Sequence, residues 1–169
     1  QKKINKMWTI IKFDRKKLSF LKKDFKQKLG DNFKIYIPKF FFHNYKNNKL
    51  VKKEFNLLGD YLFCYHDNFS NNEDLSKLKY ARGLKYFLNG FKKSQTEIVK
   101  FISRCKDAED NNGYLSKNFY QLHINSKYRF ATGPFTKMIF EIMDLHKNEI
   151  DIFMGNIKTT IRKKDFLFY

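Results

Sequence analysis

Apolar and polar positions along residues 8–105 follow two periods, one typical of strands and the other of helices. β-Branched and aromatic residues gather in strand-like runs, which are Trp8–Phe13, Leu57–Tyr65 and Leu84–Leu88. The run Leu57–Tyr65 is apolar on both faces, as expected of a central strand that is covered on both sides. A further apolar run, residues 33–42, is interrupted by Pro38 and therefore predicts either an edge strand or two pieces.

Helical periodicity appears between these runs. A helix is expected to begin near Asp14, an acceptable N-cap, and to end at Gly30, with one apolar face made by Leu18, Leu21, Phe25 and Leu29. Ser70–Glu73 and Ser94–Glu97 have the pattern of capping boxes that open two more helices. The second of these carries an apolar stripe at helical spacing, made by Ile98, Phe101, Ile102 and Cys105.

A polar turn is expected at residues 44–48, from which Leu50–Phe55 returns as a strand. The resulting order, β-α-β-β-β-α-β-α, predicts an α+β sandwich with helices against a mostly antiparallel sheet.

The last fifty residues carry a different pattern. Short strands are expected around the turn Gly133-Pro134, then at Met138–Leu145, Glu149–Met154 and Ile157–Arg162, with a possible fifth at Phe166–Tyr169. So small a sheet is expected to close on itself, which predicts an SH3-like barrel. The run Phe135–His146 would also tolerate a helix, so both conformations stay open.

Residues 107–113 are polar, acidic and glycine-containing, and they separate the two patterns. We therefore predict a first domain at 7–108, a flexible linker at 109–118 and a second domain at 119–169. Residues 1–6 precede Met7 and are left out of the fold prediction.

The chain carries 35 Lys and Arg against 17 Asp and Glu, a net charge of +18. Residues 1–110 hold 26 basic and 12 acidic side chains, so most of the excess lies in the first domain. Such a field attracts polyanions, and nucleic acid is the first candidate. A simpler explanation is biased composition, because 30 of the basic residues are Lys and the Asn, Phe, Tyr and Ile content suits an AT-rich genome.

Other classes of function find little support. Cys64 and Cys105 lie in apolar runs and are expected to be buried free thiols in a reducing cytosol. The four histidines share no ligand spacing with cysteines or carboxylates, so no metal or other cofactor is predicted. No phosphate-cradling loop or nucleophile motif indicates an enzyme. No apolar run has the roughly 18 residues that a membrane span needs, and no secretory signal is visible.

The segment around Arg129, Gly133, Pro134 and Phe135 resembles a KOW module. Together with the preceding elements it is similar to the NusG family of transcription elongation factors. Three local segments carry this resemblance: the opening Met7-Trp8, the strand entry Leu58–Phe63, and Tyr80-Ala-Arg-Gly83 followed by the strand Leu84–Leu88. It implies an NGN-like first domain and a KOW second domain.

The resemblance also implies partners. The first domain would bind the clamp of RNA polymerase through an apolar patch with Trp8, Leu58 and Tyr61, of which Leu58 is the one expected to be most exposed. The non-template DNA strand would be contacted by Arg15, Lys16, Lys17 and Arg82. In the KOW domain, Phe135, Ile139 and Met143 would either recruit a ribosomal small-subunit protein or Rho, or fill the barrel core. The protein would be cytoplasmic and monomeric and would not bind membranes.

One departure from the family pattern stands out. Gly59-Asp60 replaces the usual Pro-Gly before the tyrosine, which favours a specialised RfaH-like paralogue. Some relatives fold the KOW segment as a helical hairpin until it is released, so fold switching stays open. The alternatives are a ribosome-associated RNA-binding KOW protein and an adaptor that does not bind nucleic acid.

Overall fold

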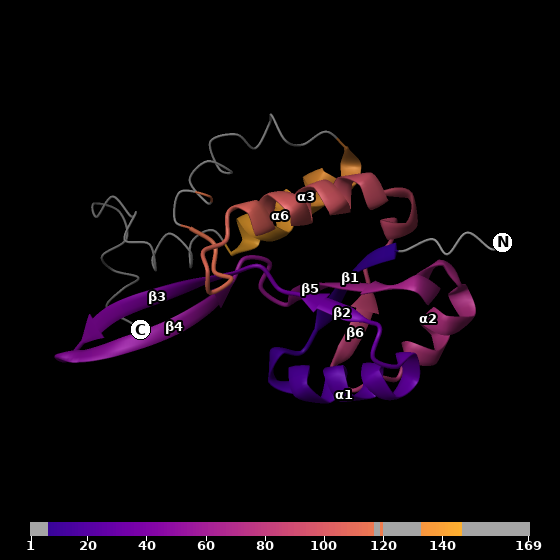
Figure 1. The fold of residues 1–169 in the computed structure, drawn as a ribbon, viewed down its shortest axis with the longest axis horizontal. Helices are drawn as coiled ribbons and strands as arrows, with labels where there is room; N and C mark the ends of the chain where they lie inside the picture. Colours follow the sequence, from indigo (N-terminus) through magenta and orange to yellow (C-terminus); the bar gives the residue numbers. More distant parts are fainter. Residues whose placement is uncertain (1–6, 117–118, 120–132, 147–169) are drawn as a thin grey trace.

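The computed structural model describes residues 7–116, 119 and 133–146 of the 169-residue chain. Over these residues the fold is α+β, with helices on both sides of an antiparallel sheet (Figure 1). The observed order up to residue 107 is β-α-β-β-β-β-α-β-α, one strand more than predicted, because the run at residues 33–42 forms two strands. One further helix lies near the C-terminal end of the described residues.

Four strands form the central sheet in the order β2-β5-β1-β6, and all neighbouring strands are antiparallel. The strands are β1 (Met7–Phe13), β2 (Lys34–Tyr36), β5 (Tyr61–His66) and β6 (Leu84–Phe87). β5 lies inside the sheet and its Leu62, Phe63 and Cys64 are fully buried. The predicted central strand is therefore confirmed, although it begins at Tyr61.

Helix α1 (Leu18–Leu29) covers one face of the sheet (Figure 1). Its buried Leu21 and Phe25 belong to the predicted apolar face. Asp14 caps the short 3-10 turn Arg15–Lys17 that precedes the helix, because its Oδ1 accepts a hydrogen bond from the Lys16 N–H at 3.0 Å. Gly30, at φ 79°, ends the helix as predicted.

Strands β3 (Lys39–Lys46) and β4 (Lys49–Asn56) form a separate hairpin that extends away from the central sheet (Figure 1). Pro38 divides this hairpin from β2, so the predicted interruption yields two pieces. Asn47 and Asn48 form the two-residue tip with φ of 52° and 59°. Positive φ at both positions is the geometry of a type I′ turn, and Asn tolerates it better than most residues.

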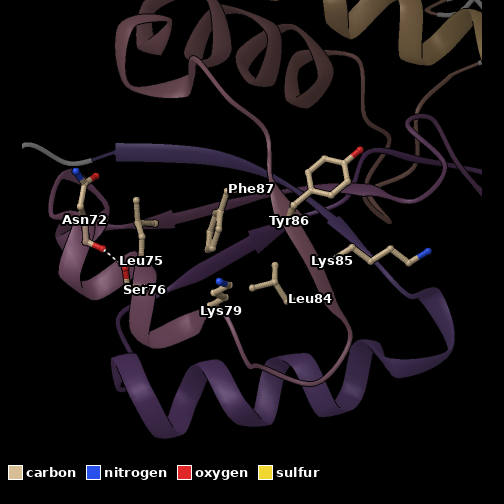
Figure 2. A pocket seen from close by; sticks show the side chains of 8 residues that line it. All are labelled: Asn72, Leu75, Ser76, Lys79, Leu84, Lys85, Tyr86 and Phe87. Atoms are coloured by element: carbon tan, nitrogen blue, oxygen red, sulfur yellow. Dashed lines mark hydrogen bonds between the residues drawn. The ribbon is translucent and has the colours of Figure 1, made fainter.

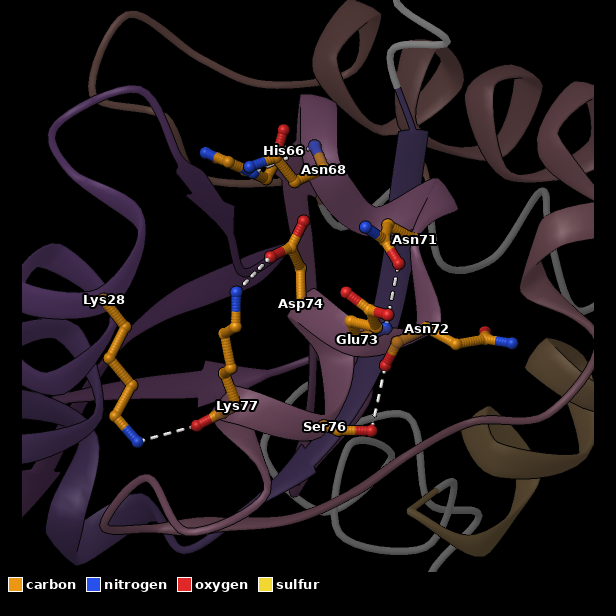
Figure 3. Close-up of polar contacts among 9 residues, drawn as sticks. All are labelled: Lys28, His66, Asn68, Asn71, Asn72, Glu73, Asp74, Ser76 and Lys77. Atoms are coloured by element: carbon orange, nitrogen blue, oxygen red, sulfur yellow. Dashed lines mark hydrogen bonds and ion pairs between the residues drawn. The ribbon is translucent and has the colours of Figure 1, made fainter.

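Helix α2 (Asn72–Leu78) follows a 3-10 turn at Asp67–Ser70. Its N-cap is Asn71, whose Oδ1 accepts from the Glu73 N–H at 2.9 Å (Figure 3). The capping box that begins at Ser70 is therefore off by one residue. Lys28 Nζ donates to the Lys77 carbonyl at 2.7 Å, which ties the end of α1 to α2 (Figure 3).

Helix α3 (Gln95–Asp107) covers the opposite face of the sheet from α1 (Figure 1). The predicted stripe of Ile98, Phe101, Ile102 and Cys105 is buried, and Phe101 meets Phe63 of β5 with ring centroids 5.8 Å apart. The predicted capping box does not form, because Ser94 makes no side-chain cap hydrogen bond and Glu97 bonds elsewhere.

The predicted linker is anchored over its described part. Glu109 and Leu115 form an isolated β-bridge, the Leu115 N–H donates to the Lys39 carbonyl at 2.8 Å, and the Leu115 side chain is buried. Tyr36 and Tyr114 donate their hydroxyl protons to Glu109 and Glu54. Residues 109–116 thus fold back on the base of the hairpin.

The strand predicted at Met138–Leu145 is wrong. Pro134–Leu145 forms helix α6, with Pro134 in its first turn, where its missing N–H costs nothing. The reason is visible in the charges, since Lys137, Glu141 and Asp144 fall at i, i+4 and i+7, on one helical face. A strand would place Lys137 and Glu141 beside the apolar Ile139 instead. The other strands predicted for the second domain lie outside the described residues.

Helix α6 packs beside α3 and joins the same core as the sheet (Figure 1). Its buried side chains are Phe135, Thr136, Ile139, Phe140, Ile142 and Met143. The described residues therefore have one connected apolar core rather than the two separate cores that the domain prediction entails. The division of the chain into two domains at residues 109–118 stays a prediction.

Candidate functional site

The loop after α2 and the start of α1 meet at one end of the sheet. The Asp14 N–H donates to the Gly83 carbonyl at 2.8 Å, and Gly83 lies so close to Lys17 that an added Cβ would come within 2.9 Å of the Lys17 Cβ. Gly83 has φ 85°, so this tight contact requires glycine in two ways. The structure thus brings together the four residues predicted to contact DNA, which are Arg15, Lys16, Lys17 and Arg82.

Arg82 is fixed by Asp24 of α1. Its Nη2 and Nε bond both carboxylate oxygens, at 2.6 Å for Nη2–Oδ1 and 3.1 Å for Nε–Oδ2, and its backbone N–H donates to Oδ2 at 2.8 Å. These hydrogen bonds, with the Arg82 side chain as the largest cause, lower the pKa of Asp24 from 3.8 to about 2. Asp24 therefore stays ionised and holds the guanidinium.

The Arg82 guanidinium also lies over the Phe20 ring at 4.7 Å, and 52% of its side chain is exposed. The arginine is positioned by protein contacts yet still open to a ligand. Arg15 is likewise paired, with its Nε 2.7 Å from Asp60 Oδ1 and about half of its side chain exposed. Lys16 and Lys17 are both exposed.

Beside this basic cluster, one lysine lies between two tyrosines on neighbouring strands. Lys12 pairs with Tyr61 of β5 on one side and with Tyr86 of β6 on the other. Its Nζ is 5.4 Å and 5.8 Å from the two ring centroids, and the two hydroxyl oxygens are 3.0 Å apart. Desolvation by burial, followed by the hydrogen bond to Tyr86, raises the pKa of Tyr61 to about 12, so the hydroxyl stays neutral.

The residues predicted to bind RNA polymerase do not form one exposed patch. Leu58 is only 1% exposed, so the expectation that it lies at the surface is wrong. It lies in the turn between β4 and β5, where its side chain fills the core. Trp8 is half-buried against Tyr65, and Tyr61 lies four residues further along the β1 ladder, roughly 13 Å away at strand spacing.

The residues predicted to bind a KOW partner are also buried. Phe135, Ile139 and Met143 are 3%, 0% and 4% exposed, because they form the inner face of α6. In this conformation they serve the core, which matches the second of the two roles considered for them but in a helix instead of a barrel.

Contacts fix both ends of α6. Glu97 Oε2 accepts from the Thr136 N–H at 2.7 Å and from its hydroxyl at 2.8 Å, so a residue of α3 caps the first turn of α6. Gly133 allows this approach, because a Cβ there would overlap the Glu97 carboxylate. At the other end, His146 fills the space beside Gly59, where a Cβ would overlap the imidazole ring.

Sequence reasoning missed four residues of these arrangements. Asp24 is the only acidic residue of α1, and this isolated charge could have indicated an ion pair. Tyr86 lies opposite Lys12 in the β1–β6 ladder. Glu97 and Gly133 carry no such signal, since their contact joins positions 36 residues apart whose adjacency depends on α6 being helical.

The described residues hold no group of three or more His, Cys, Asp or Glu side chains that could bind a metal. Among the same residues, no helix is both long and apolar enough to cross a membrane. Cys64 and Cys105 are buried free thiols, as predicted, and burial raises the pKa of both. The chain matches no protein-family model and no curated protein sequence.

Proposed function

We propose that this chain is a NusG-like transcription factor that binds RNA polymerase through an apolar face now covered by α6 and contacts the non-template DNA strand with its basic cluster. It would suppress pausing or termination in a bacterial cytoplasm without a chemical step of its own. The observation that carries the proposal is the position in which α6 is docked. A separate segment of the chain covers an apolar face of α3 and the β4–β5 turn, and only a few contacts fix its ends.

An apolar face suits a partner that stays bound to a moving enzyme, because burial is not screened by salt. If α6 leaves, that face becomes available, and the inner face of α6 is free to refold or to bind the ribosomal protein or Rho. By linkage, a partner that binds only the uncovered state shifts the equilibrium toward release of α6.

The basic cluster supports the second contact. Arg15, Lys16, Lys17 and Arg82 lie at one end of the sheet, next to Tyr61 and Tyr86. In a single strand, the cations would bind the phosphates and the aromatic rings would stack on the unpaired bases. Asp24 orients Arg82 without hiding it, which favours a contact of defined geometry over a diffuse charge effect.

The test compares Glu97→Ala with Glu141→Ala, both in the full chain. Glu97→Ala removes the cap of α6, whereas Glu141 is exposed on the outer face of the same helix. Loss of a cap costs about 0.5–2 kcal/mol, so the fraction of molecules in which α6 is undocked should rise about 2- to 30-fold. The apparent affinity for RNA polymerase should rise by the same factor. Pull-down of core RNA polymerase at raised salt measures this change.

Glu97→Ala should increase retention of the polymerase at high salt, and Glu141→Ala should leave it unchanged. The proposal fails if the polymerase is not retained by either variant. Binding only to ribosomes or RNA, with a steep loss as salt rises, would favour the ribosome-associated alternative.

A further inference from the structure

A cavity of about 400 Å³ lies between α2 and the edge strand β6, and Tyr86 is among the residues that line it (Figure 2). Pockets that hold small ligands have volumes of about 300–1,000 Å³, so this one suits a group of modest size. The residues that line it include Leu75, Ser76, Lys79, Leu84, Lys85 and Phe87, and none of the lining residues is acidic.

One wall of the cavity is apolar and aromatic. Phe87 is half-buried and meets the fully buried Phe69 edge to face, with centroids 6.1 Å apart, so its ring is held in place. Leu75 from α2 and Leu84 from β6 complete the wall. Figure 2 shows the Tyr86 ring on the other side of β6, as strand alternation requires. Phe87 is thus the aromatic surface that a ligand in the cavity would meet.

The rim of the cavity is basic. Lys79 and Lys85 are exposed at it. A third lysine, Lys92, donates from Nζ to Asn72 Oδ1 at 2.6 Å and to the Ser70 carbonyl at 3.0 Å, which fixes it next to the lining residue Asn72. A flat apolar wall surrounded by ammonium groups is complementary to an aromatic ligand that carries negative charge.

The strand itself offers hydrogen-bonding groups. The Leu88 N–H donates to the Ile10 carbonyl at 2.8 Å, and Tyr86 lies opposite Lys12 in the same ladder. By the alternation of antiparallel pairing, the backbone N–H and C=O of Phe87 point to the outer edge of β6. No described strand pairs with that edge. These groups can therefore bond the polar edge of a planar ligand.

We propose that this cavity binds one nucleotide of a single-stranded nucleic acid, with the base on Phe87 and phosphates at Lys79 and Lys85. A duplex keeps its bases stacked inside, so a base that enters the cavity must come from an unpaired strand. The site deepens the nucleic-acid contact of the proposed function, because it lies along β6 immediately after Arg82-Gly83. It extends that contact beyond the basic cluster.

The test uses the full chain and two fluorescent 12-mers, oligo(dT) and oligo(U), whose affinities are measured by anisotropy over a series of salt concentrations. Phe87→Leu keeps an apolar side chain against Phe69 but removes the ring, and it should lower affinity at least about 5-fold. Lys79→Gln with Lys85→Gln should reduce the slope of log K against log salt by about 0.7 for each lysine. The matched control is Lys100→Gln with Lys137→Gln, two exposed lysines on α3 and α6.

Photocrosslinking with a 5-iodouracil base in the 12-mer locates the contact independently of folding defects, and a crosslink to Phe87 is expected. The cavity is overturned if the control pair weakens binding as much as the test pair, if crosslinks map elsewhere, or if neither oligonucleotide binds. These outcomes are distinct from failure of the proposed function, which polymerase pull-down decides without any oligonucleotide. A preference for oligo(dT) or oligo(U) identifies DNA or RNA as the natural source of the nucleotide.

Discussion

Asp24 shows how a single side chain determines the geometry of the basic cluster. It lies among the lysines of α1, yet it is buried and accepts hydrogen bonds from both the backbone and the guanidinium of Arg82. A carboxylate in this position keeps the only arginine of the connecting loop in one orientation. The function of Arg82 therefore depends on a residue that would not itself touch a ligand.

Asp24→Asn is expected to lower the melting temperature at pH 7, because it removes the charged partner of Arg82. The folded-state pKa of Asp24, about 2, lies below the ordinary value of 3.8. The ion pair therefore contributes fully above about pH 4, and its contribution is lost as pH falls toward 2. Thermal melts of both proteins between pH 7 and pH 2 should show the difference shrinking over that range.

Asp31→Asn is the matched control, since Asp31 pairs with Lys26 in an exposed ion pair of the same helix region. Exposed pairs contribute little to stability, so this variant should melt close to the parent at every pH. A constant difference between Asp24→Asn and the parent down to pH 2 would contradict the account of Asp24.

At the scale of elements, periodicity located most helices and strands correctly. The stripe of α3, the apolar face of α1 and the central strand follow from local spacing that tertiary contacts reinforce. The failures occur where the sequence pattern allowed two solutions. The apolar content of residues 138–145 predicts a strand, although the polar spacing of Lys137, Glu141 and Asp144 favours a helix.

The candidate site was less predictable than the fold. Arg15, Lys16, Lys17 and Arg82 were grouped from the family resemblance, and the structure places them close together. Their contact with DNA stays a prediction. Leu58 was expected at the surface as part of the polymerase-binding patch that the resemblance implies, but its side chain is buried. His146, at the end of α6, lies against the neighbouring Gly59. Local sequence does not indicate a contact between positions so far apart in the chain.

The hairpin tip offers a test at the same scale. Asn47 and Asn48 both have positive φ, so Asn48→Gly should stabilise the β3–β4 pairing and Asn48→Val should weaken it by about 1–2 kcal/mol. Amide hydrogen exchange of β3 and β4 reports the change. The two substitutions at this position should change the protection of β3 and β4 from hydrogen exchange in opposite directions. A change in the same direction in both variants would contradict the turn assignment.

At the scale of the whole molecule, opposing free-energy contributions determine whether α6 is docked. Burial of a large apolar side chain contributes about 1.5–3 kcal/mol, and five such side chains of α6 are buried. Ordering the backbone of its 12 residues costs about 1–2 kcal/mol each. The cost of ordering the backbone offsets the gain from burial, so modest changes at the ends of the helix are expected to shift the population in which α6 is docked.

A chain truncated after Ser116 tests this balance. It keeps every strand of the central sheet and the Leu115 anchor but lacks α6. We expect it to fold with a stability within a few kcal/mol of the full chain and to bind more of the dye ANS, because the face of α3 beneath α6 is uncovered. Urea unfolding and ANS fluorescence provide the readouts. A truncated chain that is unfolded would show that α6 is an integral part of the fold.

The β3–β4 hairpin has a consequence for the order in which the chain folds during synthesis. Its ladder closes around two residues, whereas the pairing of β1 with β5 joins positions 49 to 59 residues apart. Short loops close within microseconds, and distant pairings form far more slowly. In a nascent chain, β3 and β4 can therefore pair before β5 has been translated, although a two-stranded hairpin alone is only marginally stable in water. The ribbon would then persist only once Phe40, Phe42 and Phe55 find the rest of the core.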